Sequence, residues 1–161
     1  MEFDEVDAII SQWERARPEA DVSPLAVLSR LTRLSKRLGR ERAAAFACAA
    51  LEPWEWDVLA ALRRSGQPLT PKQLIAATFV TSGTMTNRLT GLRERGLIAR
   101  VEHESDRRSH LVEITDAGID RVDTALDSLL RAEQRILSDF SAKERDQLAT
   151  LLRKLGSGFS S

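Results

Sequence analysis

The chain has 161 residues, of which 42% are hydrophobic and 30% charged, and this composition excludes a disordered chain of low hydrophobicity and predicts one globular domain. The 24 basic and 24 acidic residues cancel, so any nucleic-acid-binding surface must be local. A single cysteine, Cys48, excludes an internal disulfide, and the sequence indicates no cofactor. No secretory signal or membrane span can be identified, so we expect a cytoplasmic protein without a membrane partner.

Two helices are predicted in the first 50 residues. Apolar residues recur every three or four positions from Phe3 to Trp13, until Arg17-Pro18 ends the pattern. The next helix starts after Ser23, with Pro24 at the first helical position. One of its faces carries a row of leucines: Leu25, Leu28, Leu31, Leu34 and Leu38. This row predicts either packing within the core or contact with a second subunit, and the sequence leaves both open.

The segment 70–95 predicts two short helices joined by a brief turn, after a helix that opens at Pro53. Thr70-Pro71-Lys72-Gln73 has the pattern of a capping box, which starts the first helix of the pair. Thr81 or Ser82 can cap the second helix. The apolar residues that this second helix turns inward are Met85, Leu89 and Leu92.

A β-hairpin is predicted directly after this helix pair. Gly96 suits a left-handed helix end, residues 97–101 and 111–114 have strand-like patterns, and the polar stretch 102–108 turns the chain. Helix, helix and hairpin in this order predict a winged helix-turn-helix. Two further helices follow, capped by Thr115 and Ser141. The predicted fold class is therefore mainly α with a small β-hairpin wing (α+β).

The second helix of the pair begins with short polar side chains, and this is the part of a helix-turn-helix that contacts base edges and phosphates. Gly83 allows the backbone to approach the duplex, and arginines at the hairpin tip can enter the minor groove. The predicted DNA-binding residues are Thr81, Ser82, Gly83, Thr84, Thr86, Asn87, Arg88, Arg107 and Arg108. Helix capping by the hydroxyls and a solvated loop at Asp106-Arg107-Arg108 are the alternative interpretations of these features.

The segment 51–118 resembles the MarR family of winged-helix repressors, most specifically in LRERGLIAR at 92–100 and LVEITDAG at 111–118. The resemblance implies a homodimer that binds a pseudo-palindromic operator in double-stranded DNA. It also implies one MarR-like domain over 1–161, a DNA-binding lobe at 51–115, and intertwined dimerisation helices at 1–50 and 116–156. Asn87 and Gly91 stand where arginine is frequent in the family, so no base preference is carried over.

Three segments resemble the urate-responsive subgroup of this family: the N-terminal helix with Trp13, Trp54–Leu59 and Thr86–Leu89. This resemblance implies that Trp13, Asp57 and Arg88 bind a small anionic or aromatic ligand such as urate. An indole can stack on a flat ring, and a guanidinium can pair with a delocalised anion. We hypothesise that Arg88 pairs with Asp57 until the ligand competes for Arg88, shifts the helix and weakens DNA binding.

Four alternatives stay open. An enzyme or a metal sensor would use His103 and His110, whose spacing matches no standard motif. A redox-responsive regulator would use Cys48, but its alanine neighbours supply no cation for a thiolate and favour a buried, inert thiol. A winged-helix protein-interaction module would not bind DNA; the neutral net charge favours this interpretation and the hydroxyl-rich helix opposes it.

Overall fold

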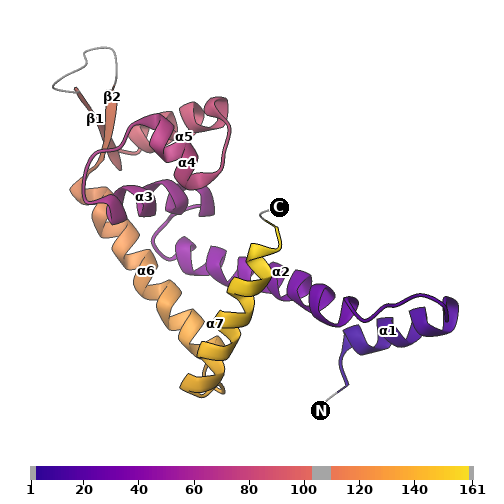
Figure 1. Cartoon of the computed structure of the whole chain (residues 1–161). Helices are drawn as coiled ribbons and strands as arrows, with labels where there is room; N and C mark the ends of the chain where they lie inside the picture. Colours follow the sequence, from indigo (N-terminus) through magenta and orange to yellow (C-terminus); the bar gives the residue numbers. More distant parts are fainter. Residues whose placement is uncertain (1–2, 103–109, 160–161) are drawn as a thin grey trace. The chain divides into compact units, whose positions relative to one another are not determined.

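The computed structural model describes residues 3–102 and 110–159 of the chain (Figure 1). Its contacts divide the chain into two units, one that ends at Ala43 and one that begins at Ala44. The elements in chain order are α1 (Glu5–Ala16), α2 (Leu25–Ala47), α3 (Pro53–Ser65), α4 (Pro71–Thr78), α5 (Ser82–Glu94), β1 (Ile98–Glu102), β2 (His110–Ile114), α6 (Asp116–Ile136) and α7 (Ala142–Ser157). The expected class, helices with one small hairpin, is confirmed.

In the first unit, ion pairs connect α1 to α2. Asp4 caps α1 by accepting hydrogen bonds from the amides of Val6 and Asp7. Arg30 of α2 donates from Nε to Asp4 at 2.8 Å and from Nη2 to Asp7 at 2.7 Å. Val6 is the one residue of α1 that is fully buried. Partly exposed ion pairs and the buried Val6 side chain thus connect α1 to the rest of the first unit.

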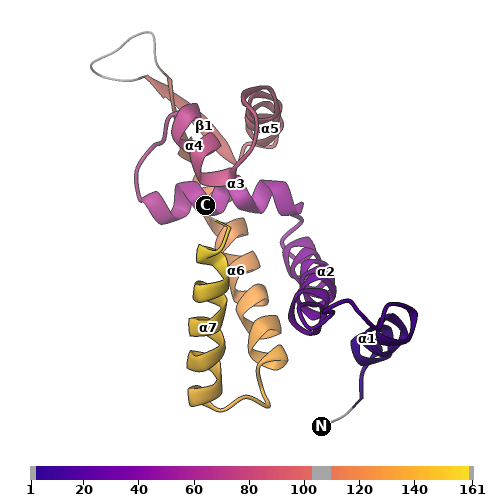
Figure 2. The same ribbon diagram turned by 45° about the vertical axis from the view of Figure 1, so that its right-hand side comes forward.

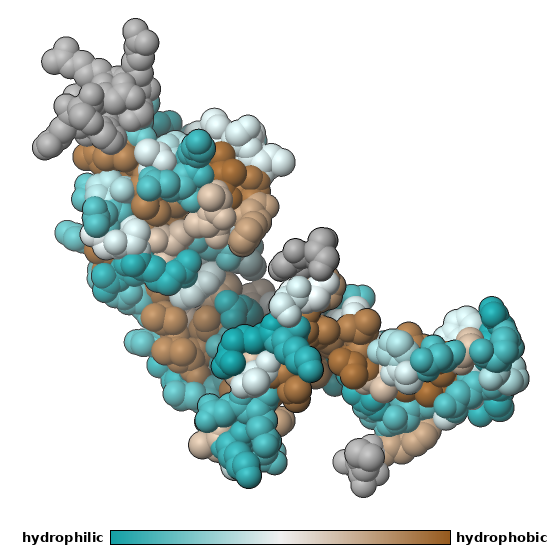
Figure 3. Space-filling view, viewed as in Figure 1, coloured by the Kyte–Doolittle hydropathy of each residue, from teal (hydrophilic) through white to brown (hydrophobic). Residues whose placement is uncertain are grey.

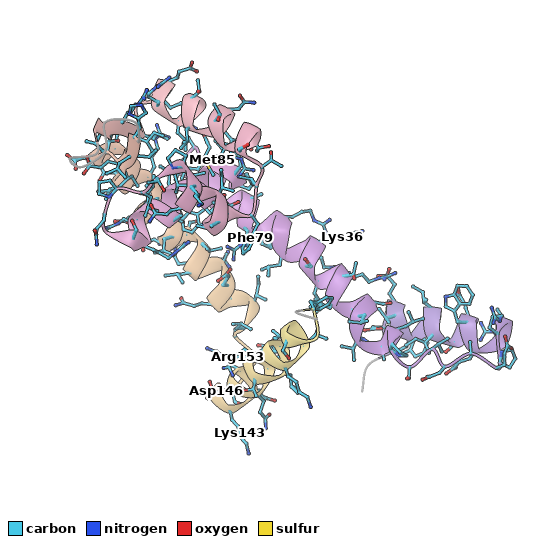
Figure 4. All side chains as sticks on the ribbon, turned by 45° about the horizontal axis from the view of Figure 1, so that its top comes forward. Lys36, Phe79, Met85, Lys143, Asp146 and Arg153 are labelled. Atoms are coloured by element: carbon cyan, nitrogen blue, oxygen red, sulfur yellow. The ribbon has the colours of Figure 1, made fainter. Side chains whose placement is uncertain are left out.

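In the second unit, α3 lies at the centre of a hydrophobic core. Its residues Val58 and Leu59 have no exposed surface, and α3 packs against α4, α5, α6 and β2. Phe46, at the end of α2, stacks on Trp56 with ring centroids 4.6 Å apart. Met85 lies within this group of helices (Figure 4). The residues that the other helices add to the core include Leu74, Met85, Leu92, Val122, Ala125 and Leu129.

The helix starts in the second unit follow the caps expected from the sequence. The capping box of Thr70 and Gln73 forms at the start of α4. Thr81, and not Ser82, caps α5, because its hydroxyl accepts a hydrogen bond from the amide of Thr84. The predicted caps of α6 and α7, by Thr115 and Ser141, also form. Hence local side-chain chemistry fixes where each of these helices begins.

The β-hairpin is tied to its surroundings at its base. β1 and β2 are antiparallel, with Ile98 opposite Ile114. Val112 of β2 also exchanges two backbone hydrogen bonds with Leu69, at 2.9 and 2.8 Å, in the segment before α4. At Gly118, in the first turn of α6, a Cβ would lie 2.2 Å from the carbonyl oxygen of Leu97, so only glycine allows this close approach. The hairpin base is thus held by both α6 and the α3–α4 connection.

Several helices expose apolar side chains. In α2, Leu28, Leu34 and Leu38 of the predicted leucine row are 43%, 59% and 39% exposed, so within this chain the row is not covered by a core. In the second unit, α7 folds back from the end of α6 (Figures 1 and 2) and has no buried residue. Figure 3 shows hydrophobic surface over α6, where Leu126 and Leu130 are exposed.

Among the described residues, no helix combines the length and apolar character needed to cross a membrane.

The carboxyl of Asp4 should make α1 sensitive to acid. Its hydrogen bonds with the Arg30 side chain, and then with backbone amides, hold the pKa of Asp4 well below its ordinary value. A lowered pKa in the folded state stabilises α1 above the ordinary pKa of aspartate, about 4, and this stabilisation is lost as the pH falls below it. We expect α1 to lose hydrogen-exchange protection, corrected for intrinsic rates, between about pH 6 and about pH 3.

The matched variant is Asp4→Asn, which keeps an oxygen that can cap α1 but removes the charge that pairs with Arg30. Its α1 protection should be low at both pH values and should change little between them. If α1 in Asp4→Asn were as well protected from hydrogen exchange near neutral pH as it is in wild type, the ion pair would not be what holds the helix.

Candidate functional site

The start of α5 presents a polar outer face. The side chains of Thr81, Ser82, Thr84, Thr86 and Asn87 are all exposed, as is Gly83. The inner face is fixed by Met85 and Leu92, which are 1% and 0% exposed. This arrangement leaves the hydroxyl and amide groups free to reach an external partner while the helix itself is anchored in the core.

The hydroxyls of α5 are partly organised by hydrogen bonds within the helix. Thr81 Oγ1 and Thr84 Oγ1 are 2.9 Å apart. Thr86 Oγ1 donates to the backbone oxygen of Ser82 at 3.1 Å, and its oxygen can still accept a hydrogen bond from a partner outside the chain. Asn87 has no such internal bond among the described residues, and its amide is available as both donor and acceptor.

The turn between α4 and α5 is made by a residue that the sequence analysis did not single out. Phe79 ends α4 with φ +54°, in the left-handed region, and its side chain is 94% exposed (Figure 4). A bulky residue rarely adopts this conformation, where glycine or asparagine is usual. The tight turn that it makes brings α4 and α5 into the packed arrangement of a helix-turn-helix.

The C-terminal end of α5 is held by an ion pair between a partly exposed arginine and a buried carboxylate. Glu55 of α3 is 2% exposed, and both of its carboxylate oxygens accept hydrogen bonds from Nη1 of Arg95. Nη2 of Arg95 donates to the backbone oxygen of Ala50 at 2.7 Å. Glu55 also accepts a hydrogen bond from the amide of Glu52 at 2.9 Å. Arg95 therefore fixes the end of α5 to the start of α3, rather than serving as a free positive charge.

Arg88 of α5 lies against α3 in a different way. Its guanidinium carbon is 5.7 Å from the ring centroid of Trp54, within the range of a cation–π interaction. Its Nη1 is buried and has no hydrogen-bond partner in the part of the chain that the structure describes. The guanidinium of Arg88 is thus in contact with Trp54, while its Nη1 makes no hydrogen bond to the described residues.

The expected ion pair between Arg88 and Asp57 is wrong. Among the described residues Arg88 contacts Trp54, whereas Asp57 is exposed and lines a pocket together with Arg64 and Phe79 that Arg88 does not border. The reason is that the Trp54 indole, a full turn closer to the start of α3, offers Arg88 a π face. Sequence reasoning missed Trp54 as a partner, although it lies in the same WEWD segment as Asp57.

The remaining predicted residues are placed as follows. Trp13 is on α1 in the first unit, where its side chain is 49% exposed, and its part in a ligand site stays a prediction. Arg107 and Arg108 lie outside the described residues, as does His103. Cys48 is exposed, not buried as expected, because its neighbours Ala45 and Ala49 turn into the core and leave it outside.

Loss of the Arg95 side chain should destabilise the second unit. Arg95→Ala leaves the buried Glu55 carboxylate without its counter-charge, so we expect the free energy of unfolding to fall by about 3 kcal/mol. Arg93→Ala, on the exposed side of the same helix, is the control and should change it by less than about 0.5 kcal/mol. Urea unfolding at one fixed protein concentration measures both; equal effects of the two substitutions would contradict the assignment.

Comparison with known proteins agrees with this geometry. A family model described as the MarR family matches residues 51–109. The HTH-type transcriptional regulator PecS of Dickeya dadantii is 35% identical over 153 residues, covering 94% of this chain and 92% of PecS. The repressor CouR, solved bound to a 23-mer DNA duplex, has a TM-score of 0.72 at 25% identity and covers 86% of this chain and 99% of CouR. An E. coli MarR mutant complexed with operator DNA shares the fold, with a TM-score of 0.71 at 22% identity over 84% of this chain and 99% of MarR.

Proposed function

Because the chain belongs to the MarR family of winged helix-turn-helix transcriptional regulators, we propose that it is a repressor released from its operator by a small anionic ligand such as urate. The observation that supports a ligand site is the state of Arg88 Nη1. This donor on α5 is buried and has no hydrogen-bond partner among the described residues. The relatives reported above are named as transcriptional regulators and not as enzymes.

The outer face of α5 is the DNA-binding surface of this proposal. Its exposed hydroxyl and amide groups suit the major groove, and a free asparagine such as Asn87 can make two hydrogen bonds with adenine. Thr81, Ser82, Gly83, Thr84 and Thr86 complete this surface and include groups that can bond to phosphates. Arg107 and Arg108, which lie between β1 and β2 in the sequence, are proposed to contact the adjacent minor groove.

The proposed repressor acts as a homodimer. Exposed apolar side chains on α2, and separately on α6 and α7, need a partner surface, and a second copy of the chain supplies one. A two-fold dimer presents α5 twice, which calls for a pseudo-palindromic operator with half-sites about 10 base pairs apart.

The ligand in this proposal is an anion that pairs with Arg88. An unpaired guanidinium donor away from water costs free energy, and an anionic acceptor removes that cost and gains a charge-assisted hydrogen bond. Trp13 and Asp57 are the further residues proposed to contact the ligand. Binding must favour the released state by about 1 to 3 kcal/mol to be useful as a signal.

Asn87 should determine the base preference at one position of each half-site. In a selection from random duplexes, Asn87→Ala is expected to relax the preference at that position and to cost about 1 to 3 kcal/mol on the preferred sequence. The control Lys143→Ala, on α7, should keep the wild-type sequence preference. An unchanged preference in the Asn87 variant would remove this residue from the interface.

Arg88 should be needed for ligand response more than for folding. We expect urate to displace wild-type protein from its selected operator and to displace Arg88→Ala at least about tenfold less effectively, because the charge-assisted contact is lost. Arg93→Ala removes the same charge from the exposed side of α5 and should keep the response. The measurement is fluorescence anisotropy of labelled operator at fixed salt, since salt alone changes the affinity. A normal urate response without the Arg88 side chain would refute the site.

A further inference from the structure

A cleft that plays no part in the proposed function lies between the end of α3, the base of the hairpin and the start of α6. Its volume is about 190 Å³. A cavity of about 150 Å³ is enough for a benzene ring, so this cleft has room for one ring with a short substituent. Four apolar side chains line it: Leu62 of α3, Pro68 of the α3–α4 connection, Ile114 of β2 and Ile119 of α6. The body of a ligand that fills the cleft should therefore be apolar.

The charged residues that line the cleft favour a positive ligand. Arg63 is one of them, but its Nε and Nη2 donate hydrogen bonds to the carboxylate of Asp123 at 3.0 and 2.9 Å. These hydrogen bonds raise the pKa of Arg63 and lower the pKa of Asp123, so the two charges persist and compensate each other. Glu113 of β2 also lines the cleft; it is exposed, and its carboxylate has no partner among the described residues. One negative charge at the cleft is thus left without a counter-charge.

The end of α3 acts in the same direction as Glu113. The helix ends at Gly66, which has φ +64° and lines the cleft. The last carbonyl groups of a helix carry the negative end of its dipole, which favours a positive charge nearby. Arg64, the other arginine of this last turn, lines the pocket beside Phe79 instead.

We propose that this cleft binds a small apolar cation, with a primary ammonium or guanidinium group on a body of about one ring. The body lies against the four apolar side chains, and the cationic group donates hydrogen bonds to the carboxylate of Glu113. An anion of the same size would meet the charge of Glu113 and would have to separate Arg63 from Asp123, so the site selects against it. Arg88 does not line the cleft, so this is a second site, for a ligand of opposite charge.

The cleft lies where the base of the hairpin is attached to the rest of the second unit. Leu69, which follows Pro68, exchanges two backbone hydrogen bonds with Val112, which precedes Glu113. A ligand that contacts both Pro68 and Ile114 spans the same two segments as these hydrogen bonds. A bound cation therefore reinforces the attachment of the hairpin.

The test uses three probes of nearly equal shape and different charge. Benzylamine is the cation, benzyl alcohol its neutral analogue and benzoate the anion. Each probe is titrated into the isotope-labelled full-length protein near neutral pH and at fixed ionic strength, and the NMR shifts of residues 66, 113, 114 and 119 give the dissociation constants. We expect benzylamine to bind about threefold to fivefold more tightly than benzyl alcohol, the value of one partly exposed ion pair, and benzoate to bind most weakly.

Variants assign the charge selectivity to one carboxylate. Glu113→Gln keeps the size of the side chain and removes its charge, so benzylamine should bind about threefold to fivefold more weakly, whereas benzyl alcohol should keep its affinity. Glu94→Gln removes the same charge from an exposed position of α5 outside the cleft and should bind all probes as wild type does. Ile119→Phe narrows the apolar part of the cleft and should weaken benzylamine and benzyl alcohol alike.

The result does not depend on the bulkier variant, because Glu113 is exposed and its substitution leaves the core unchanged. Equal affinity of wild type for the three probes would overturn the proposal. So would an unchanged affinity of Glu113→Gln for benzylamine, or shift changes that lie away from the cleft. None of these titrations involves the operator or Arg88, so they hold even where the proposed function fails.

Discussion

The DNA-binding half of this molecule depends on a carboxylate buried at the start of α3. Glu55 is 2% exposed, and it keeps its charge compensated only because Arg95 reaches it from the end of α5. A buried charge without a partner is costly, so this pair permits one arrangement of α5 on α3 and penalises others. The helix that carries the proposed DNA-binding groups is thereby fixed at its C-terminal end, while Thr81 caps its start.

The two faces of α5 differ in chemistry and in what they contact. Its outer face is polar, exposed and only loosely bonded to the rest of the chain, as suits contacts with bases and phosphates. Its inner face rests on α3 through the core residues Met85 and Leu92, and through Arg88 on Trp54. The contact of Arg88 differs from the others, because one buried guanidinium nitrogen has no partner among the described residues.

Much of the fold could be predicted from the sequence because helix ends depend on neighbouring residues. The capping box at Thr70, the caps at Thr115 and Ser141, and the hairpin that follows Gly96 all arise from local chemistry. The partners of Arg88 and Arg95 could not be predicted in this way, since several acidic and aromatic side chains of α3 were equally near in sequence. The left-handed turn at Phe79 was missed because that residue type gives no signal for it.

The base of the wing adds a geometric consequence. Thr115 bonds to the backbone oxygens of Gly96 and Leu97, and Gly118 lies in contact with Leu97, so the hairpin base and the first turn of α6 form one rigid piece. In a paired molecule joined through α6, the spacing between the two wings would be set by that helix and not by the hairpins themselves. One additional base pair between half-sites turns the second half-site by roughly 34° around the duplex axis. Two wings on rigid hairpin bases could not follow that rotation. The spacing between the half-sites would then be a stringent determinant of operator recognition.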